Sequence, residues 1–85
     1  MKNIEGQRFL TSDLHLTTAL TASGFKFSST DRVGQKIVFG FDDQSGQVGL
    51  FVDKYWLSQV SVDPLAYSTN LKYLLGLIHQ QREPL

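Results

Sequence analysis

The chain has no cysteine, only two prolines and no excess of charge of either sign. Without thiols it forms neither disulfides nor zinc sites that need sulfur, and it has no thiolate nucleophile. Eight Lys and Arg balance eight Asp and Glu, so no overall field draws the chain toward nucleic acid, anionic lipid or acidic substrates. A local basic patch is still compatible with this balance.

Long hydrophobic runs are also missing. Polar residues interrupt the amino-terminal segment 1–13, so we expect neither a signal peptide nor a membrane span there, and we expect a cytoplasmic location. The 85 residues are 41% hydrophobic and 12% aromatic, which suits a packed core rather than disorder. We therefore expect a single domain that covers residues 1–85.

A first helix is predicted after residue 12. Thr11 or Ser12 supplies a capping hydroxyl, and Asp13 places a negative charge near the positive end of the helix dipole. Gly24 suits the left-handed residue that often follows a helix. The apolar residues spaced i, i+3, i+4 form the buried stripe of this helix: Leu16, Ala19 and Leu20.

Three segments alternate apolar and polar residues as strands do, at 6–12, 25–30 and 36–42, with a turn at 31–35. One face of the predicted sheet is aromatic, with Phe25, Phe27, Phe39 and Phe41. The opposite face carries Arg8, Lys26, Ser28, Thr30, Lys36 and Val38. We expect a three-stranded, mainly antiparallel sheet with two or three helices on the aromatic face.

Segment 45–58 fits two patterns, and residues 47–53 are the ambiguous part. With period 2, Val48, Leu50 and Val52 alternate as in a strand. With period 3.6, the apolar side of a helix capped by Ser45 is formed by Val48, Leu50, Phe51, Val52, Tyr55 and Leu57. Two glycines weaken the helical interpretation, but we prefer it to the strand.

The last helix has the clearest start signal. Asp63 is a capping residue, Pro64 takes the first helical position, and the helix is predicted to run to about Gln81. One stripe, predicted to meet the core, is formed by Pro64, Tyr67, Leu71, Leu74, Leu75 and Ile78. A second stripe is formed by Ala66, Asn70, Tyr73 and Leu77, so this helix has more apolar surface than one core contact needs.

Three stretches together carry a resemblance: "FLTSDLHLTTAL" before Gly24, "IVFGFD", and "YWLSQVSVDPLAYSTNLKYLLGLI". They resemble a family of short bacterial domains of unknown function, largely cyanobacterial and phage-associated. The resemblance implies the order β-α-β-β-α-α and favours a helix over residues 47–53, but it implies no activity. The chain departs from the family pattern at Tyr73 and Leu74, where many relatives place Leu-Lys.

Candidate catalytic and ligand residues are isolated. His15 follows Asp13 closely, yet no serine lies in a nucleophile motif, so an exposed histidine explains the pair better than a general base. Asp42 and Asp43 match no calcium loop and are ordinary turn residues, and the glycines form no phosphate-binding loop. We predict no catalytic, cofactor-binding or metal-binding residue, no cofactor, and no enzyme.

The preferred function is therefore a protein–protein interaction module, either a homo-oligomer or a small adaptor. Its predicted interface lies on the last two helices and consists of Trp56, Ala66, Asn70, Tyr73 and Leu77, because aromatic and aliphatic residues distinguish interface centres. The alternative is a small nucleic-acid-associated regulator that uses Arg8, Lys26 and Lys36 on the open sheet face. We expect no membrane partner.

Overall fold

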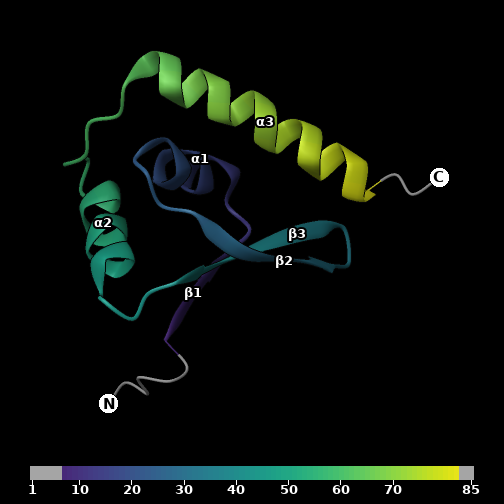
Figure 1. Ribbon diagram of the computed structural model, residues 1–85, viewed down its shortest axis with the longest axis horizontal. Helices are drawn as coiled ribbons and strands as arrows, with labels where there is room; N and C mark the ends of the chain where they lie inside the picture. The colour runs from purple at the N-terminus through teal and green to yellow at the C-terminus, as the bar shows by residue number, and fades with distance from the viewer. Residues whose placement is uncertain (1–6, 83–85) are drawn as a thin grey trace.

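The computed structural model describes residues 7–82 and confirms an α+β fold in the predicted order β-α-β-β-α-α (Figure 1). The strands are β1 (Arg8–Thr11), β2 (Phe27–Val33) and β3 (Lys36–Asp42), and the helices are α1 (Leu14–Ala22), α2 (Gln47–Trp56) and α3 (Pro64–Arg82). The predicted strand start at Gly6 lies outside the described residues. The sheet order is β1-β3-β2, and both pairs of strands are antiparallel.

The helices lie on one side of the sheet, with α1 between the sheet and α3 (Figure 1). The predicted aromatic face is the buried one, because Phe39 and Phe41 have no exposed surface. Phe27 meets both rings edge to face, at centroid distances of 5.1 and 6.2 Å. The rest of the buried cluster comes from β3 and the three helices: Leu16, Leu20, Ile37, Val48, Val52 and Leu74.

The structure corrects the predicted pattern of β2 with a bulge at Ser28. Phe27 pairs with Phe41, but Ser29 pairs with Gly40, so β2 carries one extra residue. Because side chains alternate, every later residue of β2 changes face. Thr30, predicted on the open face, lies instead on the helix-covered face, where its hydroxyl accepts a hydrogen bond from Gln81 Nε2 at 3.1 Å.

The predicted turn at 31–35 is too long. The strand continues to Val33, which pairs with Lys36, and only Gly34 and Gln35 connect the two strands. Gly34 has φ +62°, a conformation that glycine adopts without a steric penalty and that two-residue hairpin turns require.

Helix α1 begins one residue later than predicted. The cap is Asp13, not Thr11 or Ser12, because Asp13 Oδ1 accepts from the Leu16 amide at 3.0 Å. The end is as predicted. Gly24 has φ +102°, and the Phe25 amide donates to the Leu20 carbonyl at 3.0 Å, which closes a Schellman motif.

Two threonines of α1 are fully buried. Thr17 and Thr18 have no exposed surface, although threonine is a poor helix former. Their hydroxyls donate to carbonyls one turn earlier, those of Asp13 and Leu14, at 2.8 and 2.7 Å. A helix enclosed by the sheet on one side and by α3 on the other can contain threonine because these hydrogen bonds satisfy the polar atoms.

Segment 47–53 is helical, which confirms the preferred interpretation. The cap differs from the prediction, however. The Asp43 carboxylate accepts from the amides of Val48 and Gly49, at 2.8 and 3.0 Å, whereas Ser45 Oγ makes only a 3.4 Å contact with the Gln47 amide. A side chain four residues before the helix therefore satisfies its first free amides.

The cap of α3 is as predicted, with Asp63 Oδ2 accepting from the Ala66 amide at 2.8 Å. Its buried side is rotated from the predicted stripe. Leu74 is fully buried, and Leu77 and Ile78 pack against the core, whereas Leu75 is 49% exposed and Pro64 is exposed as well. At about 100° per residue, the buried side is therefore centred near Leu74 and turned toward Leu77.

Candidate interaction surface

The predicted interface stripe on α3 is only partly open. Leu77 packs against the core, and Ala66 and Asn70 are half-buried. Asn70 Nδ2 donates to the Ala66 carbonyl of the same helix at 2.8 Å. Tyr73 is the exception, with 62% of its surface exposed. Of these four side chains, Tyr73 therefore has the most surface to offer a partner.

Trp56 is the last residue of α2 and is 63% exposed. Its indole meets the ring of Tyr55 edge to face, with the centroids 5.0 Å apart. The helix stops there because Ser58 adopts φ +59° and the Gln59 amide donates to the Lys54 carbonyl at 2.8 Å. A serine in this conformation is strained relative to glycine.

Tyr55 lies where the three helices meet. Burial raises the pKa of its hydroxyl above the ordinary value of 10.0, and the nearby Asp13 and Tyr67 raise it further. The hydroxyl oxygen of Tyr67, in the first turn of α3, lies 2.7 Å from His15 Nδ1, which is hydrogen-bond distance. Residues from α1, α2 and α3 thus share one small surface region.

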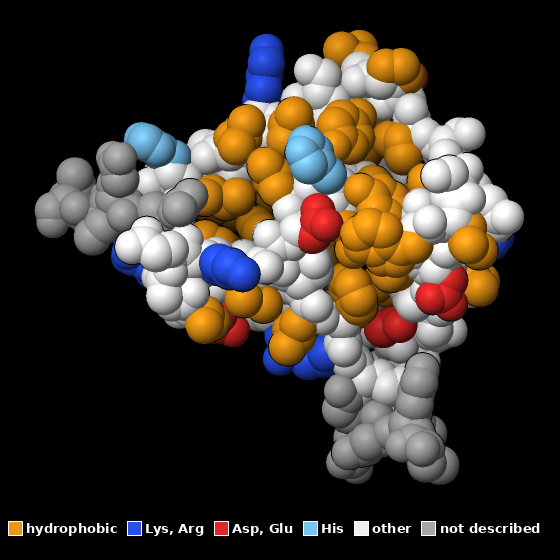
Figure 2. Space-filling view, turned by 180° about the vertical axis from the view of Figure 1, so that it is seen from behind, with side chains coloured by type: hydrophobic (Ala, Val, Ile, Leu, Met, Phe, Trp, Pro, Cys, Tyr) orange, Lys and Arg blue, Asp and Glu red, His pale blue; other side chains and the backbone are white. Residues whose placement is uncertain are grey.

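The apolar surface continues from this region along α3. Leu71 and Leu75 follow Tyr67 at successive intervals of four residues, so the three side chains form one line along the helix. We call the resulting surface the apolar ridge; it consists of Tyr55, Trp56, Tyr67, Leu71 and Leu75. Figure 2 shows one face of the molecule on which hydrophobic side chains gather over the helices, around a histidine and an acidic side chain.

Trp56 and Tyr73 do not belong to one surface. Trp56 contacts Tyr55, which lies near Asp13 at the start of α1. Tyr73 instead borders a pocket with Thr21 and Gly24, at the end of α1. The nine residues of α1 separate these points by about 13 Å. Trp56 and Tyr73 therefore lie near opposite ends of α1.

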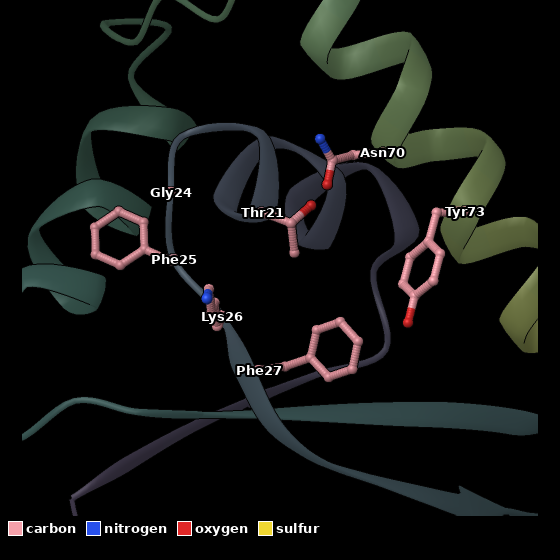
Figure 3. A pocket seen from close by; sticks show the side chains of 7 residues that line it. All are labelled: Thr21, Gly24, Phe25, Lys26, Phe27, Asn70 and Tyr73. Carbon is pink, nitrogen blue, oxygen red and sulfur yellow. The ribbon is translucent and has the colours of Figure 1, made fainter.

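That pocket has a volume of about 440 Å³ (Figure 3). Its lining comes from α1, from the start of β2 and from α3: Thr21, Gly24, Phe25, Lys26, Phe27, Asn70 and Tyr73. In the close-up, the rings of Phe25 and Tyr73 stand on opposite sides, with the polar ends of Thr21 and Asn70 near one another (Figure 3). Sequence reasoning missed this pocket because its walls come from three separate elements.

The three basic residues of the alternative site are far apart. Arg8 and Lys36 lie at opposite ends of the sheet, since Arg8 pairs with Asp42 and Lys36 pairs with Val33. Six residues of β3 separate these positions by about 20 Å. The Arg8 guanidinium also donates to the Ser29 hydroxyl across the sheet. Lys26 precedes β2 and borders the pocket, so the three residues form no basic patch.

The acidic residues have structural roles or lie apart. Asp43 caps α2, and Asp13 and Asp63 cap α1 and α3. Within residues 7–82, no three His, Asp or Glu side chains come close enough together to hold a metal ion. His15 is exposed and has Tyr67 as its hydrogen-bond partner.

Across the part of the chain that the structure describes, no helix has both the length and the apolar character that a membrane span needs. The resemblance to short bacterial domains stays a prediction. No family model matches the chain, and no curated protein or solved structure shows significant similarity to it.

Proposed function

We propose that this protein is a non-enzymatic interaction module that forms a symmetric dimer through the apolar ridge. The observation that supports this proposal best is the exposure of Trp56. Tryptophan is rarely left open on a monomer and is enriched at the energetic centres of interfaces. Trp56 is also continuous, through Tyr55 and Tyr67, with the exposed Leu75 on the next helix.

The distribution of exposed apolar residues also supports an interface on the helices. Within residues 7–82, the large hydrophobic side chains that are exposed are Leu10, Val33, Leu50, Trp56, Leu57, Leu65, Tyr73 and Leu75. Only Leu10 and Val33 belong to the sheet; the others come from α2, its C-cap and α3. An apolar surface rimmed by polar residues is typical of an interaction site.

A second copy of the chain is the partner we propose. Copies with zero net charge do not repel one another, and a twofold axis near Leu71 would pack Tyr67 of one copy near Leu75 of the other. Along α3 the ridge runs from Tyr67 to Leu75, about 12 Å at 1.5 Å per residue, and the end of α2 extends it sideways. A surface of this extent suits the apolar centre of an interface whose rim is polar.

The proposal includes a cytoplasmic setting and no catalysis. A small domain without cysteine uses none of the disulfide bonds that stabilise many secreted domains of this size. His15, the histidine that was weighed as a general base, is exposed and pairs with a tyrosine rather than with an acid.

Sedimentation velocity over a range of concentrations tests the dimer. The wild-type chain is expected to shift from monomer to dimer as its concentration rises. The double variant Trp56→Ala, Leu75→Ala is expected to weaken the dimer by at least about 30-fold, the effect of losing one strong interface residue. Both side chains are largely exposed, so the variant keeps its fold, which circular dichroism checks.

Leu10→Ala is the matched control, because Leu10 is 56% exposed but lies on the sheet. It is expected to leave the association unchanged. Leu77 is a poor site for this test, since its contact with the core would confuse lost association with lost stability. A wild-type chain that stays monomeric at millimolar concentration contradicts the proposal.

A further inference from the structure

The pocket at the end of α1 is built by local backbone structure. The Schellman motif reverses the chain at Gly24 and directs Phe25 and Lys26 away from the helix axis. Phe25 is held by an edge-to-face contact with Phe51 of α2, at 5.6 Å between centroids. Phe27 is held by its contacts with the buried rings of β3. Two of the aromatic walls are therefore fixed by the fold before any ligand binds.

The third aromatic wall, Tyr73, projects from α3. Its ring faces the pocket from α3 and is 62% exposed, so it can adjust to an occupant (Figure 3). The volume of about 440 Å³ lies within the range of small-molecule sites, which are mostly apolar with a few polar groups that fix orientation. The room suits a single ring with a short side chain.

The polar groups at the pocket have unused bonding capacity. The Thr21 hydroxyl donates to the Thr18 carbonyl at 3.1 Å and can still accept, and Asn70 uses one amide hydrogen on Ala66. Lys26 is exposed, and within residues 7–82 no side chain or carbonyl pairs with its ammonium. An unpaired cation beside aromatic walls favours a ligand with an apolar body and one negative charge.

We infer that this pocket binds a small amphipathic carboxylate, with its ring between Phe25, Phe27 and Tyr73 and its carboxylate on the Lys26 ammonium. This site is separate from the apolar ridge, because the two lie at opposite ends of α1. Binding of such a ligand therefore neither requires nor excludes the proposed dimer, and each proposal can fail without the other.

The test uses the probe 3-phenylpropionate and its uncharged amide, 3-phenylpropanamide, titrated into ¹⁵N-labelled protein and followed by backbone amide shifts. The carboxylate is expected to shift the amides of Gly24, Phe25 and Lys26 in a saturable way. The amide analogue is expected to bind about three- to fivefold more weakly, the effect of one exposed ion pair.

Two variants assign the effect to the pocket. The variant Lys26→Gln is expected to bind the carboxylate and the amide equally. The control is Lys36→Gln, because Lys36 is exposed at the hairpin end of the sheet; this variant is expected to keep the preference for the carboxylate. Tyr73→Ala is expected to weaken both probes. Any of three results overturns the inference. The wild type could bind the two probes equally, or the shifts could be confined to the apolar ridge. The third is that no saturable shift occurs at 20 mM, about the weakest binding of interest for a single ring.

Discussion

The guanidinium of Arg8 lies over Gly40 and donates to the hydroxyl of Ser29. Arg8 is in β1, Gly40 in β3 and Ser29 in β2, so one side chain crosses the whole sheet on its open face. The arrangement needs the bulge at Ser28, because without it Ser29 would point to the other face. It also needs glycine at position 40, since a Cβ there would collide with both partners.

Gly40→Ala is therefore expected to displace the Arg8 guanidinium and to cost about 0.5–1.5 kcal/mol of stability, the net contribution of its hydrogen bond to Ser29. Gly76→Ala is the matched control. Gly76 lies within α3 with open space around the position of a Cβ, so alanine there is expected to stabilise by about 0.5–1 kcal/mol. Urea denaturation of the two variants measures both effects. A neutral Gly40→Ala would contradict the crowded geometry.

The cap of α2 gives a second prediction. Asp43→Ala removes the acceptor of two backbone amides and is expected to cost about 1–2 kcal/mol of stability. Ser45→Ala removes only a 3.4 Å contact and is expected to change stability by less than about 0.5 kcal/mol. The free energies of unfolding in guanidinium chloride compare them. A larger loss at Ser45 than at Asp43 would show that the cap is assigned to the wrong residue.

The contrast between Asp43 and Ser45 shows which helix caps the sequence could predict. Asp63 and Gly24 were predicted because a cap and a left-handed residue are signalled by neighbours in the chain. Asp43 reaches its amides from five and six residues away, across a turn, and no local pattern favours it over Ser45. The local pattern of segment 45–58 left strand and helix open, the resemblance favoured the helix, and neither predicted its cap.

The residues that face solvent were harder to predict for a related reason. Leu75 and Leu77 flank Leu74 on opposite sides of α3, and both are apolar. Which of them is buried depends on how α3 crosses α1, a contact between distant segments. The pattern correctly predicted a surplus of apolar surface on α3, but Leu75 rather than Leu77 carries more of it.

Alkaline conditions test the surroundings of Tyr55. Its pKa is raised in the fold, so above pH 10.0 the unfolded chain loses the proton before the folded chain does. The stability that the protonated Tyr55 hydroxyl contributes is fully present below pH 10.0, and it is lost as the pH rises through the higher pKa that Tyr55 has in the folded chain. Tyr55→Phe removes this loss. Unfolding free energies at pH 8 and pH 11, about one unit above the ordinary tyrosine value, are expected to differ less in Tyr55→Phe than in the wild type.

Tyr73→Phe is the control for this comparison, because Tyr73 is an exposed tyrosine on the same helical layer. It is expected to behave as the wild type does. If Tyr55→Phe shows the full alkaline loss of the wild type, the Tyr55 hydroxyl is not in the partly buried position near Asp13 that the fold gives it.

The proposed dimer can be observed directly through Trp56 of the apolar ridge, because Trp56 is the only tryptophan of the chain. Acrylamide quenching of its fluorescence, measured from about 0.1 to 500 µM protein, covers the range of ordinary protein affinities. The account predicts that quenching falls as concentration rises, with the same midpoint as the increase in mass. Quenching that stays the same at every concentration would contradict it, because Trp56 would then remain exposed whatever the chain binds.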